Sequence, residues 1–287
     1  MAILEVRNLT HTYGGSSPFV NDAVSCVSFS VEKGEIIGII GHTGSGKSTL
    51  VQHLNGLLKP TDGMVLFCDK DIWENPKEIR KIRSKVGLVF QYPEYQLFEE
   101  TVFEDISFGP KNMGLSGDEL KNTVLEICEL VGVKSEYYDK SPFDLSGGEK
   151  RRVAIAGVMA MKPEVIVFDE PTAGLDPKGR EDIMQIIKDY RKATGATVII
   201  ISHSMEDMAL LADKILVMNK GEIFKFGTVK EVFSDAEALR KIGLNVPIVT
   251  KVFEELIKLG IDVQNDVFTV DSAVLALKKL KEGMKNA

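Results

Sequence analysis

The sequence predicts an α/β fold: a phosphate-loop core with a mainly parallel sheet, an antiparallel β region, an inserted helical subdomain and a small C-terminal α/β extension. Apolar strand-like runs alternate with helical stretches, and such units build a parallel sheet with helices on both faces. Residues 41–48 have the pattern G-x-x-x-x-G-K-S between a strand-like run and a helical one. The pattern becomes helical at about 92–162 and changes again after 240. These shifts predict a core domain at 1–240, with the insertion at 92–162, and an extension at 241–287.

The N-terminal part predicts short strands. Residues 3–8 alternate in the manner of an edge strand, residues 24–31 give a second strand, and residues 35–40 form an apolar run typical of a buried parallel strand. Tyr13 follows the first strand and is a candidate platform for stacking a purine base. An isolated tyrosine at a strand end more often only packs on its neighbours, so both interpretations stay open.

The phosphate-loop pattern has a clear physical basis. Its glycines let the backbone bend tightly around an anion, and successive backbone N–H groups point inward at it. The positive end of the following helix adds to this attraction, and that helix is expected to end at Gly56. Lys47 can reach the β- and γ-phosphates, and the Ser48 hydroxyl can bind Mg²⁺. The candidate nucleotide-binding residues here are Gly41, His42, Thr43, Gly44, Ser45, Gly46, Lys47, Ser48 and Thr49.

Polar side chains follow three later strands, predicted at 86–90, 165–170 and 196–202. Open α/β sheets bind ligands at the carboxyl ends of their strands. Gln91 is therefore a candidate for contact with Mg²⁺ or the attacking water, and Asp169 for holding Mg²⁺. Glu170 lies where a general base for water can act, and His203 can donate to a γ-phosphate. Taken singly, the glutamine is a surface residue, the acids cap a strand and the histidine is structural.

The inserted segment predicts two amphipathic helices. Ser116 and Glu119 have the spacing of a capping box, and the helix that they open carries its apolar face at Leu120, Val124, Ile127, Cys128 and Val131. The second helix begins near Ser146 and continues through Met161. A hairpin is expected at 214–226.

The last 47 residues predict a small unit. Pro247 is well placed to start a helix, two short β-like stretches follow Gly260, and Asp271 is expected to cap a final helix. Two short amphipathic helices cannot build a deep core alone, so they pack on the main domain or meet a partner. We favour the partner.

The composition is that of an ordinary globular protein. The chain has 287 residues, 44% of them hydrophobic, a formal net charge of −7 and a pI of about 5.3. This acidic balance argues against nucleic acid as the main partner. The three cysteines have no metal-binding spacing and suit a reducing cytosol. We expect no signal peptide and no membrane span, hence a cytosolic chain or one bound to a membrane through another protein.

Together these motifs resemble the ATPase domain of ABC transporters over residues 3–235. The phosphate loop, Gln91 of the Q-loop and the segment 145–149 (LSGGE) of the signature occur in the family's order. The resemblance implies ATP and Mg²⁺ as cofactors, head-to-tail ATPase dimers and roles at the matching positions. It implies Glu170, His203, Gln91 and Asp176 in catalysis, Ser48, Gln91 and Asp169 at the metal, and Tyr13, Ser146, Gly147, Gly148 and Glu149 in nucleotide binding. Phe19 competes with Tyr13 for the adenine.

A finer resemblance is to the energy-coupling-factor transporter ATPases. It rests on residues 91–102 (QYPEYQLFEETV), residues 41–49 (GHTGSGKST), residues 52–57 (QHLNGL) and the tail after 240. It implies a homo- or heterodimer with a related ATPase, in which this chain looks like the second one. A transmembrane scaffold and a substrate-capturing membrane subunit complete the assembly, which is peripheral on the cytoplasmic face and imports vitamins or transition-metal ions.

Two rival functions remain open. One is a soluble ABC ATPase that acts on nucleic acid or the ribosome. ABC ATPases that act in DNA repair usually carry a long coiled coil, whereas this chain has no sustained heptads. ABC ATPases that act in translation usually carry two ATPase cassettes in one chain, whereas this chain has one. The other rival is an exporter ATPase, against which the segment 92–102 argues.

Overall fold

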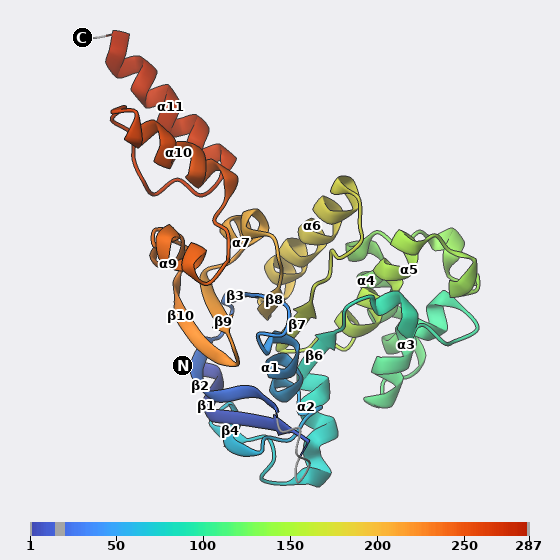
Figure 1. Ribbon diagram of the computed structural model, residues 1–287. Helices are drawn as coiled ribbons and strands as arrows, with labels where there is room; N and C mark the ends of the chain where they lie inside the picture. Colours follow the sequence, from blue (N-terminus) through green and yellow to red (C-terminus); the bar gives the residue numbers. More distant parts are fainter. Residues whose placement is uncertain (1, 15–20, 286–287) are drawn as a thin grey trace.

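The computed structural model describes residues 2–14 and 21–285, and its centre is a six-stranded sheet (Figure 1). The strand order is β10-β9-β3-β8-β7-β6. Every neighbouring pair is parallel except the β9–β10 hairpin. The strands are β3 (Ile36–Gly41), β6 (Val86–Val89), β7 (Val165–Asp169), β8 (Thr197–Ile201), β9 (Lys214–Asn219) and β10 (Glu222–Thr228). The predicted mainly parallel sheet is confirmed.

An antiparallel sheet forms the predicted second β region, with strand order β2-β1-β4-β5. Its strands are β1 (Ala2–Tyr13), β2 (Asn21–Glu32), β4 (Asp62–Phe67) and β5 (Lys70–Asp71). The expectation that the first strand is an edge strand is wrong. β1 pairs with β2 on one side and β4 on the other, so its alternation reflects one buried and one exposed face rather than a free edge.

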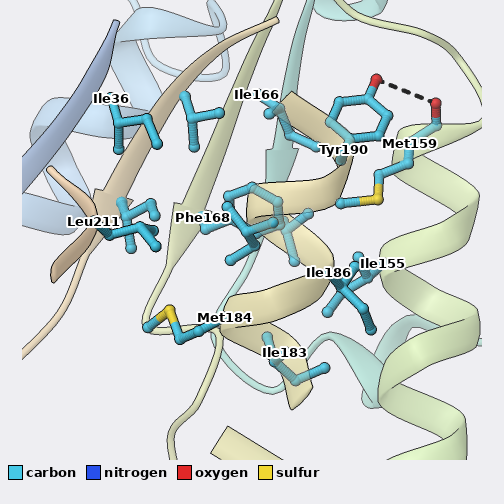
Figure 2. Packing of buried hydrophobic residues seen from close by; sticks show 14 of the residues in the cluster. Ile36, Ile155, Met159, Ile166, Phe168, Ile183, Met184, Ile186, Tyr190 and Leu211 are labelled. Atoms are coloured by element: carbon cyan, nitrogen blue, oxygen red, sulfur yellow. Dashed lines mark hydrogen bonds between the residues drawn. The ribbon is translucent and has the colours of Figure 1, made fainter. Parts of the chain in front are cut away.

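Helices cover both faces of the large sheet, and each face has its own hydrophobic core. Figure 2 shows Ile166 and Phe168 of β7 packed with α5 and α6, where the Tyr190 hydroxyl donates to the Met159 carbonyl at 3.4 Å. Val165 and Val167 of β7 face the opposite core, with α1 and the antiparallel sheet. Because both faces are buried, the parallel strands are continuous apolar runs. The covering helices are α1 (Lys47–Leu54), α2 (Ile79–Lys85), α6 (Pro177–Thr194), α7 (Met205–Leu211), α8 (Val229–Phe233) and α9 (Ala236–Lys241), with the short 3₁₀ turn η1 (Pro76–Glu78).

The chain between β6 and β7 is helical and lies to one side of the sheet (Figure 1). The apolar face predicted for α4 is buried. Ser116, however, makes no side-chain cap, and its φ of −152° contrasts with −65° at Ser146, where a capping box does form. The two Ser-x-x-Glu sequences thus differ in backbone conformation, and only the one at Ser146 forms a capping box. The elements are η2 (Pro93–Gln96), α3 (Val102–Asn112), α4 (Gly117–Val131), η3 (Ser135–Tyr137), η4 (Pro142–Asp144) and α5 (Gly147–Met159).

The chain ends in two helices that project beyond α9, α10 (Ile248–Lys258) and α11 (Val270–Lys285) (Figure 1). They share a small core of Phe253, Val267 and Ala273. The predicted β-like stretches are not strands: residues 261–269 are irregular, and none of the described strands pairs with them. Asp271 lies inside α11, and Thr269 Oγ1 instead accepts from the Ser272 N–H at 3.2 Å. Across the described residues, no helix has the length and apolar content that a membrane crossing requires.

Candidate nucleotide-binding site

The phosphate loop joins β3 to α1 at the carboxyl end of the sheet, and steric contacts within the chain require its glycines. A Cβ at Gly46 would lie 2.2 Å from the carbonyl oxygen of Ala23, and its φ is +97°. A Cβ at Gly41 would lie 2.4 Å from the carbonyl oxygen of Met218. Both distances are far below van der Waals contact, so only glycine lets the loop pack between β2 and β9.

Lys47 points into this loop. Its side chain is buried, and Nζ donates to the carbonyl oxygens of Gly41 and His42 at 2.8 Å each. Burial lowers the pKa of Lys47, while the nearby Glu170 and Asp169 carboxylates oppose that shift. Ser45 Oγ is also buried and has no hydrogen-bond partner among the described residues. A desolvated ammonium and an unpaired hydroxyl inside a glycine loop at a helix N-terminus suit an anionic ligand.

Gln91, Glu170 and His203, three residues that the sequence singled out after separate strands, meet through hydrogen bonds. The Glu170 carboxylate accepts from Gln91 Nε2 at 3.0 Å and from His203 Nε2 at 2.7 Å. Since an ionised carboxylate only accepts, the His203 Nε2 is the nitrogen that carries the proton in this contact. Glu170 itself has a φ of +50°, which is costly for a non-glycine residue and typical of functional sites. The carboxyl ends of β6, β7 and β8 thus hold one polar cluster.

Asp169 lies beside this cluster and fits a magnesium ion. Its carboxylate is buried and accepts from the Ser48 hydroxyl; burial raises its pKa, and the Ser48 bond opposes the rise. The described residues contain no group of three or more His, Cys, Asp or Glu side chains able to hold a metal by themselves. The donors here are a hydroxyl, a carboxylate and an amide oxygen. Mg²⁺ prefers such oxygen ligands and is commonly held by one or two carboxylates together with substrate phosphates.

The signature segment is built differently, and its residues Ser146, Gly147 and Gly148 are exposed. Ser146 caps α5: its backbone N–H and hydroxyl donate to Glu149 Oε2 at 2.9 and 2.7 Å. Glu149 also accepts from the Tyr137 hydroxyl, which lowers the Glu149 pKa to about 2 and raises the Tyr137 pKa to about 12. Beyond the helix itself, no atom of the described residues lies within 4 Å of the Cβ positions of Gly147 and Gly148. These residues form an exposed helix N-terminus whose hydrogen bonds remain local.

The remaining predicted residues lie around this site. Tyr13 ends β1 and is 44% exposed, and the ring of His11 packs edge-on against its ring with the centroids 4.5 Å apart. Phe19, the alternative stacking residue, is outside the described residues. Asp176 caps α6 by accepting from the Gly179 N–H at 2.9 Å, and in the described part of the chain no hydrogen bond joins its side chain to the Glu170 cluster. His42 Nε2 donates to the Ile242 carbonyl, next to the exposed loop residues Thr43 and Gly44. The carbonyl of Thr49 accepts from His53 Nδ1 at 2.7 Å.

Two residues at the site escaped the sequence analysis. Arg151 of α5 and Glu94 of η2 form a buried ion pair at 2.7 Å, beside the segment that follows Glu170. Arginines at 151 and 152 look equivalent in the sequence, and only packing separates them. A charged residue's burial is not visible in local sequence, so no pattern marked either partner.

Comparisons with known proteins agree with this geometry. The family model described as ABC transporter matches residues 24–173. An "Energy-coupling factor transporter ATP-binding protein EcfA2" from Caldanaerobacter subterraneus subsp. tengcongensis is 51% identical over 99% of both chains. One of the same name from Clostridium perfringens is 52% identical over 96% of this chain and 98% of its own length.

Solved structures give the same result. The structure of cbiO1 from Clostridium perfringens, described as part of the ABC transporter complex cbiONQ, has a TM-score of 0.75 and 40% identity, covering 88% of this chain and 99% of that one. A dimeric ATP-binding cassette in a post-hydrolysis state, bound to ADP and Pi, has a TM-score of 0.71 and 30% identity, covering 79% of this chain and 98% of that one.

Proposed function

The chain belongs to the ABC transporter family, and we propose that it is the ATP-binding and ATP-hydrolysing subunit of an energy-coupling-factor importer. The observation that carries this proposal is the Glu170 cluster beside the phosphate loop, in a chain about half identical along its full length to subunits of that name. Residues 1–240 would form the ATPase domain, with 92–162 inserted, and residues 241–287 a dimerisation extension.

ATP binding follows from the loop geometry. The backbone N–H groups of 41–49 and Lys47 Nζ bind the phosphates, and the carbonyl partners of Lys47 are exchanged for phosphate oxygens. Mg²⁺ would be held by Ser48 and Asp169, with Gln91 at its edge, and would offset phosphate charge. Tyr13, with its exposed ring at the end of β1, would stack the adenine.

Hydrolysis requires an activated water, and Glu170 is the group placed to act on it. Its carboxylate is oriented by two donors from neighbouring strands, which fixes the lone pair that would accept the water proton. When the γ-phosphate is present, the Nε2–H of His203 can donate to it instead, and Lys47 and His203 then offset the charge that develops in the transition state. Asp176 would act across the dimer interface.

The signature segment would serve the ATP of a second ATPase subunit. Gly147 and Gly148 are not required by packing within this chain, and a glycine-rich helix start with an adjacent serine suits a γ-phosphate approaching from outside. Two subunits arranged head to tail would then each complete the other's site. The exposed apolar side chains of α10 and α11 support a second contact between the subunits: Ile248, Val252, Ile257, Val270, Val274, Leu275 and Leu277.

A groove of about 980 Å³ is the proposed docking site for the membrane scaffold. It lies between α2, η2, α3 and α5, directly after the Q-loop residue Gln91. Phe98 and Phe108 line it with exposed rings 4.8 Å apart, and basic side chains of α2 form its rim. An apolar floor with a polar rim fits an amphipathic helix of a partner. This docking would hold the chain at the cytoplasmic face of the membrane.

The experiment that tests the importer function is a pull-down of the tagged chain from detergent-solubilised native membranes, with mass spectrometry of the eluate. We expect a related ATPase, a polytopic scaffold and small membrane proteins, whose identity would indicate the vitamin or metal ion carried. The Phe98→Glu variant should lose the membrane proteins, whereas Phe224→Glu, at another exposed phenylalanine, on β10, should retain them. Recovery of ribosomal or DNA-repair proteins alone would overturn the transport function and leave the ATPase function standing.

Binding of ATP has its own test. Lys47→Ala removes the buried ammonium from the loop, and we expect the dissociation constant for ATP to rise by about 100-fold, as for the loss of a charge-assisted contact with phosphate. Isothermal titration calorimetry measures it directly. An unchanged dissociation constant would contradict the assigned site.

A further inference from the structure

Arg151 is a buried arginine that uses its guanidinium to hold two separate loops. It lies on α5, one turn after the signature glycines, and is only 2% exposed. Nε and Nη2 donate to the two carboxylate oxygens of Glu94 at 2.9 and 2.7 Å, a bidentate pair. Nη1 donates to the carbonyl oxygens of Ala173 and Pro171 at 2.7 and 3.3 Å. The three nitrogens of one side chain thus have fixed partners.

These partners belong to the nucleotide site of the same chain. Glu94 lies three residues after Gln91, in η2. Pro171 and Ala173 follow Glu170 directly, and the Ala173 N–H donates back to the Glu170 carbonyl at 3.1 Å. Arg151 therefore fixes both the segment after the Q-loop glutamine and the turn that carries the proposed general base. Because Glu170 and Gln91 also bond to each other, α5 and the two loops form one connected unit.

The start of α5 has a different ligand. Under the proposed function, Ser146, Gly147 and Gly148 face the ATP held by the partner subunit, whereas Gln91 and Glu170 face the ATP of their own chain. We propose that the Arg151–Glu94 pair links these two sites. When the start of α5 binds the ATP held by the partner subunit, the pair couples the position of α5 to the loops that orient Glu170 at the ATP of its own chain. Arg151 is then a positioning residue for hydrolysis, and the inference rests on the proposed dimeric ATPase.

The chemistry of the pair suits this role better than a purely stabilising one. A buried ion pair contributes little net stability compared with apolar residues of the same size. Its value is geometric, because the planar guanidinium fixes the directions of its acceptors. A second pair, Arg191–Asp213, provides the matched control: Arg191 also bonds a carboxylate, at 2.9 Å, and a backbone carbonyl, that of Gly34 at 2.9 Å, but it joins α6 to the start of β9, away from the nucleotide loops.

The test uses the complex recovered with the tagged chain and measures ATP hydrolysis against ATP concentration. For the wild type we expect a Hill coefficient above 1 and below about 2, the number of sites. Arg151→Lys and Glu94→Gln should lower it to about 1, with the ATP dissociation constant of the separated subunit unchanged. Arg191→Lys should keep the wild-type Hill coefficient. The double variant should lose no more cooperativity than either single one, since both remove one link.

Three outcomes would overturn the link: a wild-type Hill coefficient of 1, variants that lose turnover but keep the wild-type cooperativity, or a control that loses cooperativity equally. If Arg151→Lys does not fold, Glu94→Gln, which keeps the side-chain volume and one acceptor oxygen, still decides the matter. A wild-type complex that binds ATP without hydrolysing it would instead refute the proposed function itself, and the link with it.

Discussion

Two glycine-rich helix starts in this chain, the phosphate loop before α1 and the signature segment before α5, differ in what requires their glycines. At Gly46 a Cβ would collide with the backbone of Ala23, and the loop closes on its own buried Lys47. At Gly148 a Cβ would meet no other described residue within 4 Å, and the helix start is closed by the capping box of Ser146 and Glu149. The first glycine is required by the fold of this chain. The second is unexplained by that fold, which points to a requirement outside it.

The same contrast extends to the surrounding charges. Around α1 the lysine, Asp169, Glu170 and the strand-end donors converge from four parts of the sheet. At the start of α5, Glu149 interacts with Ser146, with the Tyr137 hydroxyl and with the charge of Lys134. One site is assembled inside the chain, and the other is, under the proposed function, half of a site. The predictions that follow test this distinction, beginning with the largest expected effect.

Glu170→Gln should abolish turnover while ATP binding persists. The amide keeps the size of the carboxylate but cannot accept the water proton, so we expect hydrolysis to fall by about 1,000-fold. Steady-state phosphate release and ATP titration measure the two properties separately. Glu181→Gln, an exposed glutamate on α6, is the control. Hydrolysis near the wild-type rate would remove Glu170 from the catalytic role.

Gly46→Ala should destabilise the fold. The added methyl group collides with a backbone carbonyl 2.2 Å away and must adopt a φ of +97°, so we expect a loss of about 3 kcal/mol in the free energy of unfolding. Urea unfolding followed by circular dichroism measures it. A urea midpoint equal to that of the wild type would mean that the loop shifts to accommodate the methyl group. The fold of the chain would then not require glycine at position 46.

A buried histidine in α1 should make the fold less stable as the pH decreases. His53 of α1 is fully buried, and burial lowers its pKa from 6.5 to about 4. Its Nδ1 donates to the Thr49 carbonyl, so Nε2 accepts from His11. Because the unfolded chain binds the extra proton at higher pH than the folded one, the free energy of unfolding falls as the pH decreases from about 6.5 to about 4. The full loss is about 3 kcal/mol.

The measurement is urea unfolding at a series of pH values, compared with His53→Gln, which keeps a donor for Thr49 but does not titrate. We expect the variant's stability to depend less on pH over this interval. Glu149 acts in the same direction at lower pH: its pKa of about 2 lies below its ordinary 4.5, so its contribution is lost as the pH falls from about 4.5 to about 2. If the free energy of unfolding depends on pH equally in the wild type and the variant, His53 does not cause the loss of stability in acid.

Gly148→Ala should have the smallest effect on stability and of the opposite sign to Gly46→Ala. Alanine is the better helix former and meets no neighbour here, so we expect a gain of about 0.5 kcal/mol. Hydrolysis by the assembled complex should nevertheless fall by about 10-fold, because the methyl group occupies the space proposed for the partner's γ-phosphate. Unchanged hydrolysis would contradict the proposal that the partner's γ-phosphate requires glycine at position 148.

Several elements show which features of the fold the local sequence predicts. The apolar runs at β3, β7 and β8 and the periodicity of α4 were sufficient to predict those elements, because burial on two faces or one leaves a direct trace in the sequence. The β-like stretches after Gly260 and the capping box at Ser116 were wrong. A strand after Gly260 would need a neighbouring strand, and a cap at Ser116 depends on the backbone conformation there. The local residues predict neither condition.

By itself the sequence determined the phosphate loop, the order of strands and helices and the polar residues at the strand ends, because each rests on local chemistry: glycine at a turn, apolar residues in a buried strand, an acid after it. Tertiary structure alone decided that Glu170 meets both Gln91 and His203, that Lys47 is folded into its loop, and that Arg151 rather than Arg152 binds the nucleotide loops. These facts depend on which distant segments the sheet order brings together, and long-range packing has no local signature.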